Sequence, residues 1–219
     1  MKILLVSNLY DIRYEHYLLN LLFCEGLQYY HLRKENYTEV EMRKYIERIP
    51  HYFHERIIIH SHFHLLEEYG LKGVHFTKQN IKKHLNYKFD APIPHGHMSF
   101  SLHSIREIPR LKIPFNYIFL SPVFDSISNK GYNSKFKPEE LKIFLKEYQN
   151  RPEIIALSGI DYNSFVKAME LGFDGAAFLG YIWTDFEADQ DIIIAVKKFN
   201  RIQSALEQHQ IKQNDTFVS

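Results

Sequence analysis

Short apolar runs alternate along the chain with longer segments that carry apolar residues at helical spacing. Eight runs have strand length, and several are continuously apolar, as in a parallel sheet whose two faces are covered by helices. These predicted strands lie at residues 2–7, 27–32, 56–60, 73–76, 98–102, 116–120, 153–157 and 175–179. The predicted helices lie at residues 13–24, 38–49, 65–69, 78–83, 104–109, 138–148, 164–171 and 192–206.

Residues that begin and end helices agree with these boundaries. Thr38 and Glu41 have the spacing of a capping box, and Gly172 is suited to end a helix. Eight strand–helix units in 219 residues predict an α/β protein, a single (β/α)8 TIM barrel over residues 1–206. Residues 207–219 form a polar C-terminal tail that we expect to fray. An open doubly wound sheet uses the same units and stays an alternative.

Composition narrows the classes of partner. The chain has 27 basic and 26 acidic side chains, which gives no electrostatic footprint for nucleic acid or an anionic membrane. No stretch approaches the roughly twenty apolar residues of a membrane span. The lone cysteine, Cys24, lies in an apolar run, where we expect it to be buried, and it cannot form an internal disulfide. We therefore expect a soluble, cytoplasmic protein.

Small residues follow the last two predicted strands, where a ligand can approach the backbone. Ser158 and Gly159 follow the seventh strand, and Gly180 follows the eighth. In (β/α)8 barrels these two loops, together with a helix N-terminus, commonly form a phosphate site. The alternative is that both glycines only permit tight turns. Their equivalent positions on consecutive units favour the phosphate site.

Several different short motifs lie near the strand ends, and together they span almost the whole chain. They are His31-Leu32-Arg33-Lys34-Glu35, Gly70-Leu71-Lys72-Gly73-Val74-His75-Phe76, Ser101-Leu102-His103-Ser104, Ser121-Pro122-Val123-Phe124, Lys130-Gly131, Ala156-Leu157-Ser158-Gly159-Ile160 and Gly172-Phe173-Asp174-Gly175-Ala176-Ala177. Their order and spacing resemble the thiamin phosphate synthase and thiazole tautomerase (TenI-type) superfamily. The resemblance implies a barrel that binds a phosphorylated thiazole in thiamin biosynthesis.

The synthases of this superfamily join a pyrimidine diphosphate to a thiazole phosphate, with magnesium, and release pyrophosphate. The resemblance places their glutamine, arginine and lysine at His31, Arg33 and Glu35, so that only the arginine is retained. It places their Asn-Asp pair at His60-Ser61 and a further aspartate at Asn80. Both carboxylates are missing, and serine and asparagine are poor replacements for a magnesium ligand. We therefore expect no cofactor, with magnesium only if synthase activity is retained.

The tautomerase branch lacks that metal site and aromatises a thiazole carboxylate phosphate by proton transfer. The position of its acid–base histidine holds Pro122 here, so the sequence departs from both branches. Histidine remains the natural proton shuttle near neutral pH. The candidate catalytic residues are His103, His31 and Arg33. The candidate substrate- and phosphate-binding residues are Ser158, Gly159, Gly180, Ser101, Ser126, Lys130 and His60.

Three histidines alternate at His60, His62 and His64, and in an extended segment they would face one way. Zinc binds such sets. However, no cysteine or nearby carboxylate completes a recognised spacing, and the segment is predicted to turn into a helix. We interpret the group as loop histidines with one substrate contact, and we predict no metal site.

Three functions follow from these observations. The first is a thiamin-pathway enzyme that binds a phosphorylated thiazole and performs TenI-like proton transfer or an altered synthase reaction. The second is an ordinary magnesium-dependent synthase, and the third is a non-catalytic protein that binds a phosphorylated ligand. A phosphosugar isomerase is less favoured, because no glutamate base stands out after the sixth or seventh strand. Barrels of this kind often pair, which leaves a homodimer open.

Overall fold

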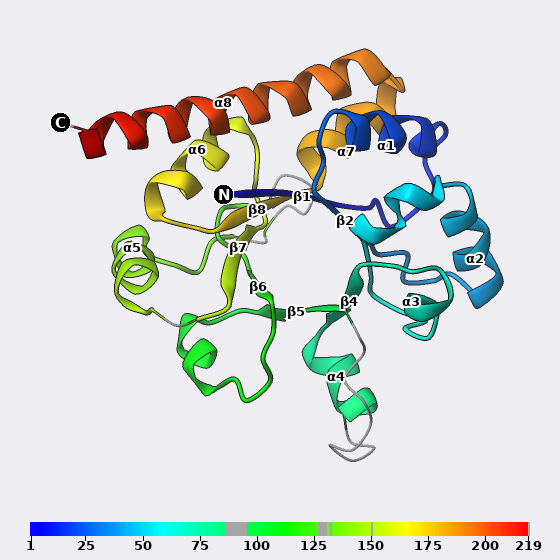
Figure 1. Ribbon diagram of the computed structural model, residues 1–219, viewed down its shortest axis with the longest axis horizontal. Helices are drawn as coiled ribbons and strands as arrows, with labels where there is room; N and C mark the ends of the chain where they lie inside the picture. Colours follow the sequence, from blue (N-terminus) through cyan, green and yellow to red (C-terminus); the bar gives the residue numbers. More distant parts are fainter. Residues whose placement is uncertain (86–95, 127–130, 132, 150, 219) are drawn as a thin grey trace.

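The eight predicted strands close into one parallel barrel in a computed structural model that describes residues 1–85, 96–126, 131, 133–149 and 151–218 (Figure 1). The strands are β1 (Lys2–Val6), β2 (Tyr29–Leu32), β3 (Ile57–Ile59), β4 (Gly73–Phe76), β5 (His97–Leu102), β6 (Tyr117–Leu120), β7 (Glu153–Leu157) and β8 (Gly175–Phe178). Each strand pairs with the next, and β8 pairs with β1 to close the ring. The (β/α)8 prediction is confirmed, and an open sheet is excluded.

Helices connect the strands around the outside of the barrel (Figure 1). They are α1 (Glu15–Cys24), α2 (Glu39–Glu47), α3 (Leu65–Glu68), α4 (Lys78–Leu85), α5 (Pro138–Glu147), α6 (Tyr162–Leu171), α7 (Gly180–Asp189) and α8 (Ile192–Val218), with two 3-10 helices, η1 (His51–Arg56) and η2 (Ile105–Arg110). The long α8 packs against α1, α6 and α7. Among the helices of the described part of the chain, none combines the length and apolar character needed to cross a bilayer.

The predicted helix ends are confirmed where a residue with special chemistry sets them. Thr38 and Glu41 form a capping box, in which the Thr38 side chain accepts from the Glu41 backbone N–H and the Glu41 side chain accepts from the Thr38 backbone N–H. Gly172 ends α6 with a φ of 92°, a left-handed conformation that glycine adopts without steric cost.

Three expectations about the helices are wrong. The sequence pattern predicted no helix directly after Gly180, but these residues form α7, because Ile182, Trp183 and Phe186 share one buried face. The last helix continues to Val218 and does not end at residue 206, since the segment after it contains neither glycine nor proline to stop a helix. Cys24 is exposed, because it lies on the face of α1 opposite its buried leucines.

The interior of the barrel is filled by side chains that alternate along each strand. Apolar side chains come from β1, β3 and β6–β8, and they are Leu4, Val6, Ile58, Tyr117, Phe119, Ile155 and Ala177. Because side chains on a strand alternate between its two faces, His31, His75 and Ser99 of β2, β4 and β5 also point inward. Apolar and polar side chains therefore share the barrel interior, with these polar groups on β2, β4 and β5.

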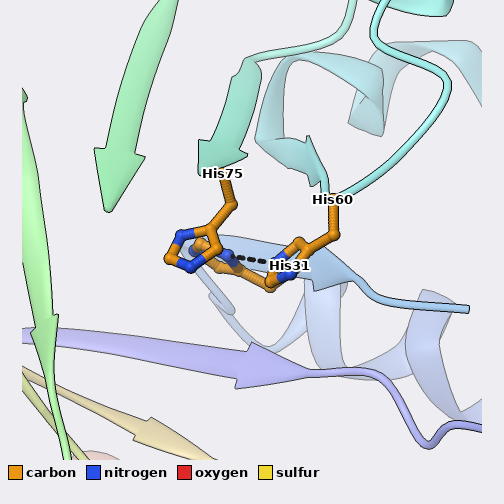
Figure 2. A group of neighbouring side chains, drawn as sticks. All are labelled: His31, His60 and His75. Carbon is orange, nitrogen blue, oxygen red and sulfur yellow. Dashed lines mark hydrogen bonds between the residues drawn. The ribbon is translucent and has the colours of Figure 1, made fainter. Parts of the chain in front are cut away.

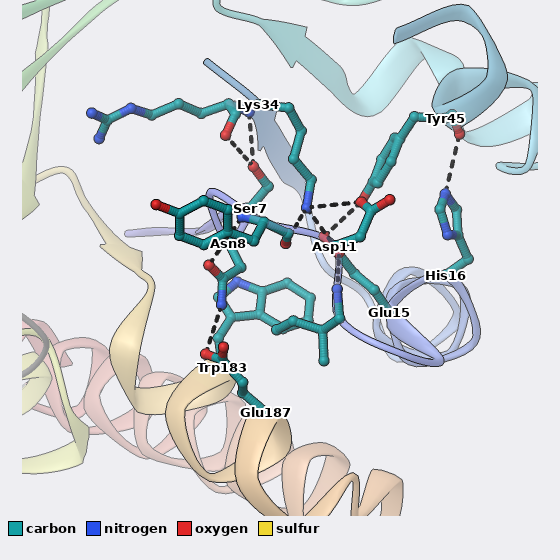
Figure 3. A network of polar contacts seen from close by, with 12 residues as sticks. Ser7, Asn8, Asp11, Glu15, His16, Lys34, Tyr45, Trp183 and Glu187 are labelled. Carbon is teal, nitrogen blue, oxygen red and sulfur yellow. Dashed lines mark hydrogen bonds and ion pairs between the residues drawn. The ribbon is translucent and has the colours of Figure 1, made fainter. Parts of the chain in front are cut away.

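A buried ion pair fastens the end of β2 to the start of α1 (Figure 3). The Lys34 ammonium group is fully buried and lies 2.9 Å from a carboxylate oxygen of Glu15, which is also buried. The other Glu15 oxygen accepts hydrogen bonds from the hydroxyl groups of Tyr30 (3.1 Å) and Tyr45 (2.7 Å). The backbone carbonyl of Tyr10 also accepts from Lys34, at 2.7 Å. The buried charge is thus fully compensated by its neighbours.

We predict that Lys34→Met lowers the free energy of unfolding by about 3–5 kcal/mol, because it leaves the Glu15 carboxylate buried without its cation. The double variant Lys34→Met/Glu15→Gln removes both charges and keeps an acceptor for the two tyrosines, so it should be clearly more stable than the single variant. Urea denaturation of both variants measures this. A double variant that is as unstable as Lys34→Met would contradict the assignment.

Candidate functional site

The candidate site is a cavity of about 790 Å³ at the rim where the C-terminal ends of the strands meet. In (β/α)8 barrels this is the rim that carries the active site. Most of the site residues predicted from the sequence line it, namely Arg33, His60, Ser101, His103, Ser126, Ser158, Gly159 and Gly180. His31 lies below the wall of the cavity, fully buried, and Lys130 falls outside the described residues. Segments far apart in the sequence therefore meet in one place.

The loop after β7 holds two consecutive residues in the left-handed conformation. Ser158 has a φ of 78° and Gly159 a φ of 67°. Such a conformation is strained for a serine and is typically found at ligand-binding turns. The buried Ser158 hydroxyl has no hydrogen-bond partner among the described residues. An anionic ligand in the cavity can accept the hydrogen bond that this hydroxyl lacks.

Strand β8 leads directly into helix α7, whose N-terminus lies at the same cavity. The helix α7 begins at Gly180, and no side chain caps its first turn. Leu179 and Gly180 both line the cavity. The N–H groups at a helix N-terminus, together with the helix dipole, favour a phosphate or a carboxylate. The ends of β7 and β8 thus bring groups that favour an anion to one corner of the cavity.

The opposite side of the cavity carries a paired arginine. The Arg33 Nε donates to a Glu35 carboxylate oxygen at 2.7 Å, and Nη2 donates to the same oxygen. Both side chains are about half exposed. Glu35 occupies the position that the superfamily resemblance assigns to a lysine, so the acidic replacement neutralises the arginine that remains.

The two positions expected to hold magnesium ligands line the cavity without a carboxylate. They are Ser61, after β3, and Asn80, in α4. The Asn80 side chain is used locally, since its Oδ1 accepts from the Thr77 backbone N–H at 2.7 Å. Among the residues that the structure describes, Glu35 is the sole carboxylate lining the cavity. These residues do not fit a magnesium ion, which prefers carboxylate oxygens.

Three imidazoles meet at the floor of the cavity (Figure 2). His31 Nδ1 lies 2.9 Å from His60 Nε2, and His31 Nε2 lies 2.6 Å from the Tyr117 hydroxyl. The ring of His75 stacks on the ring of His60 with a centroid distance of 4.3 Å. The two ring nitrogens of His75 are hydrogen-bonded to Ser99 and Ser101, each at 2.8 Å.

These three imidazoles are neutral. Burial lowers the pKa of His31 and His60 well below the usual value, and the neighbouring histidines lower both further. Burial, with a smaller contribution from Arg33, lowers the pKa of His75 to about 3. The cause is the same for all three, because a charged imidazolium loses its hydration in the barrel interior.

His103, His62 and His64, which were also considered from the sequence, lie outside this group of three imidazoles. His103 is exposed at the cavity edge, where the Ser121 carbonyl accepts a hydrogen bond from its Nδ1 at 2.9 Å. In the neutral ring this leaves Nε2 as the basic nitrogen. His62 bonds the Tyr37 carbonyl, and His64 lies 3.2 Å from Glu39. Neither therefore joins His60, and the set that sequence spacing suggested does not assemble.

Sequence reasoning did not select His75 as a site residue. The signal was present in the run Gly73-Val74-His75-Phe76, where strand alternation puts His75 on the same face as Gly73. Gly73 leaves no room for a side chain, because an added Cβ would lie 1.9 Å from the His97 carbonyl oxygen. A polar residue on an inward face of a tightly packed strand is an indicator of function.

The closed ring of eight parallel strands and the cavity at its C-terminal rim define this chain as a (β/α)8 barrel. The thiamine monophosphate synthase family (TMP-TENI) matches residues 5–182, and the chain belongs to this family. No curated protein sequence matches significantly.

Solved structures agree with this family. The chain is similar to the thiamine phosphate pyrophosphorylase of Bacteroides thetaiotaomicron, with 29% identity and a TM-score of 0.79 over 94% of this chain and 98% of the other. It is also similar in fold to the thiamine phosphate pyrophosphorylase of Pyrococcus furiosus, with 15% identity and a TM-score of 0.71 over 95% and 96% of the two chains. The (S)-3-O-geranylgeranylglyceryl phosphate synthase of Thermoplasma acidophilum shares the fold at 9% identity and a TM-score of 0.63, over 95% and 93% of the chains.

We predict that Gly159→Ala destabilises the protein more than Gly70→Ala does. Both glycines have a positive φ, for which alanine costs about 1–2 kcal/mol. At Gly70 the added Cβ meets nothing within 4 Å, but at Gly159 it would lie 2.2 Å from the Asp125 carbonyl oxygen. Overpacking should add about 1–3 kcal/mol. Thermal or urea unfolding measures the difference, and equal losses would contradict this geometry.

Proposed function

We propose that this protein binds a phosphorylated thiazole of thiamin biosynthesis, with the phosphate at the ends of β7 and β8. The observation that carries the proposal is the left-handed pair Ser158-Gly159 beside the uncapped N-terminus of α7. Family membership supports the choice of ligand class. Ser101 and Ser126 line the same cavity and extend the set of hydroxyl groups around the ligand. The remainder of the thiazole then extends toward Arg33 and the histidines.

The chemistry that fits best is proton transfer, or a much altered synthase reaction, without a magnesium ion held by carboxylates. The missing carboxylates at Ser61 and Asn80 support this choice, as does the pairing of Arg33 with Glu35. A diphosphate at this end would meet an acidic side chain in place of a lysine. Metal and basic side chains are what neutralise a departing pyrophosphate.

His103 is the acid–base residue of this proposal. Its Nδ1 is engaged by the Ser121 carbonyl, so Nε2 is the nitrogen available for a proton, and it stands at the cavity edge. His31 does not line the cavity, but it is hydrogen-bonded to His60, which does, and it acts as a positioning residue for His60. Arg33 binds the acidic groups of the substrate when it exchanges its pairing with Glu35 for them. A non-catalytic protein that binds the same ligand is the alternative, because the catalytic positions of both branches of the family are replaced.

We predict that Ser158→Gly weakens binding of thiazole phosphate about 10- to 100-fold without loss of stability. Glycine accepts a φ of 78° without strain, but the hydroxyl that would donate to the phosphate is gone. Isothermal titration calorimetry measures the affinity. Gln190→Gly makes the same backbone change at φ 54° outside the cavity and should bind normally. If wild-type protein ignores thiazole phosphate, the proposal fails.

Turnover separates the enzymatic and non-catalytic alternatives. Incubation with thiazole carboxylate phosphate should change its ultraviolet spectrum as the ring aromatises, and His103→Asn should reduce the rate by about 100-fold or more. Binding that raises thermal stability without any spectral change would favour the non-catalytic alternative. Formation of thiamin phosphate from pyrimidine diphosphate, thiazole phosphate and magnesium by the wild-type protein would instead favour an ordinary synthase.

The missing carboxylates give a complementary prediction. We expect Ser61→Asp/Asn80→Asp to bind magnesium more tightly than the wild-type protein, because both side chains face the cavity that the ion would enter. Magnesium titration followed by calorimetry compares the two proteins. Ser61→Asn/Asn80→Gln, with similar volume and no added charge, is the control. Equal magnesium affinity of all three would show that these positions do not form the metal site.

A further inference from the structure

Three neighbouring strands of the barrel each deliver one histidine to the same point. His31 lies in β2, His60 directly follows β3, and His75 lies in β4 (Figure 2). Each offers one ring nitrogen, and these three nitrogens all lie within 4.8 Å of one another. Among the described residues this is the group whose chemistry and spacing suit a metal ion. His60 stands at the first position of the family's Asn-Asp pair, whereas the positions of the two missing carboxylates, Ser61 and Asn80, are not part of the group.

We propose that His31, His60 and His75 bind one divalent transition-metal ion, with zinc as the representative metal, at the floor of the cavity. Imidazole nitrogen is a preferred ligand of zinc, copper and nickel, whereas magnesium and calcium prefer oxygen. Three histidines with one open position form a recurrent zinc environment. The site shares His31 and His60 with the proposed thiazole-phosphate cavity, but its test does not require that ligand. It differs from the expectation of no metal that the sequence pattern gave.

Tyr117 can hold His31 in the tautomer that a metal needs. The Tyr117 hydroxyl bonds His31 Nε2 at 2.6 Å, and the other nitrogen, Nδ1, faces His60. A tyrosine oxygen that accepts from Nε2–H leaves Nδ1 unprotonated and aimed inward. Histidines that bind metals nearly always have such a partner on the outer nitrogen.

His75 has an equivalent support on β5. Its ring nitrogens are bonded to Ser99 and Ser101, so one hydroxyl can hold the outer nitrogen while the other nitrogen turns to the metal.

The distances require only small ring movements. A tetrahedral zinc ion with Zn–N bonds of about 2.0–2.1 Å places its nitrogens about 3.3 Å apart. His31 Nδ1 and His60 Nε2 are 2.9 Å apart, and the three nitrogens lie within 4.8 Å. His60 and His75 line the cavity, whereas His31 closes the site from below. The fourth position therefore opens toward the cavity, where water or a ligand oxygen can occupy it.

Metal titration of the full-length chain, without a histidine tag and after treatment with a chelator, tests the proposal. We expect one zinc ion per chain by calorimetry, and intense visible absorption from four-coordinate cobalt(II) when cobalt replaces zinc. Magnesium should give no response at this site. Absence of zinc binding by the wild-type protein would overturn the proposal and would mean that the histidines form only a hydrogen-bonded network. Thiazole-phosphate binding is measured separately, so failure of one does not imply failure of the other.

Single-residue variants test which side chains bind the ion. His60→Asn should weaken zinc binding by more than about 100-fold and abolish the cobalt absorption, because it removes a ligand from the half-buried cavity wall. Tyr117→Phe keeps all three ligands but removes the support of His31, so zinc should bind about 10- to 100-fold more weakly. His64→Asn, which changes an exposed histidine paired with Glu39, should leave both signals intact.

Circular dichroism and thermal unfolding establish that each variant is folded before the titration. Unchanged zinc affinity in folded His60→Asn, or a loss in His64→Asn equal to that in His60→Asn, would place the ion elsewhere and overturn the proposal. His75→Asn provides a second, independent ligand removal for the case in which His60→Asn fails to fold.

Discussion

Closure of eight parallel strands fixes where every polar group of the site lies. Each strand is only three to six residues long, so the side chain at its C-terminal end is never far from the cavity. Parallel pairing sets Val6 beside His31, His31 beside Ile58, and His75 beside Ser99. Since side chains alternate across a strand, these inward positions stack in layers inside the barrel. Residues separated by more than 150 positions in the sequence thereby share one cavity.

The same closure divides the rim into two chemically different halves. At β7 and β8 the backbone itself provides the polar groups, through Ser158, Gly159 and the start of α7. At β2 to β5 side chains provide them. Here Glu35, Ser61 and Asn80 stand where the superfamily resemblance implies a lysine and two carboxylates, and His31 and His60 stand where it implies glutamine and asparagine. Backbone groups tolerate changes of side chain, whereas side-chain ligands do not. The phosphate half of a family site can therefore persist while the other half acquires different chemistry.

The barrel could be predicted from the sequence because the strands are short, mostly apolar runs and some of the helices have a recognisable start or stop. Helix α7 could not, because the glycine at its first residue resembles a loop signal and its helical face is defined only by contact with the barrel. For the site, strand ends correctly predicted that His60, His103 and Ser158 would line one cavity. The histidine triplet could not be predicted, since local spacing groups His60 with His62 and His64. The register between strands groups it with His31 and His75 instead.

Strand β2 and the residues that follow it connect the site to the stability of the barrel. His31 points inward to the histidine group, and Arg33 faces the cavity. Lys34, which follows Arg33, forms a buried ion pair with Glu15 of α1. The Ser7 hydroxyl accepts from the Arg33 backbone N–H at 2.8 Å and donates to its carbonyl at 3.0 Å, which continues the pairing of β1 and β2 beyond the strand end.

This arrangement gives the buried ion pair a role beyond stability. A shift of Lys34 would move Arg33, the residue before it, and through the strand also His31. Three hydrogen-bonding neighbours, Tyr10, Tyr30 and Tyr45, offset the cost of desolvating Lys34 and Glu15, and such satisfied networks hold a backbone in one position. A metal or substrate site requires that kind of rigidity, because its ligands must stay within a few tenths of an ångström of their working positions. The network on the outside of β2 therefore determines how well the polar half of the cavity is held.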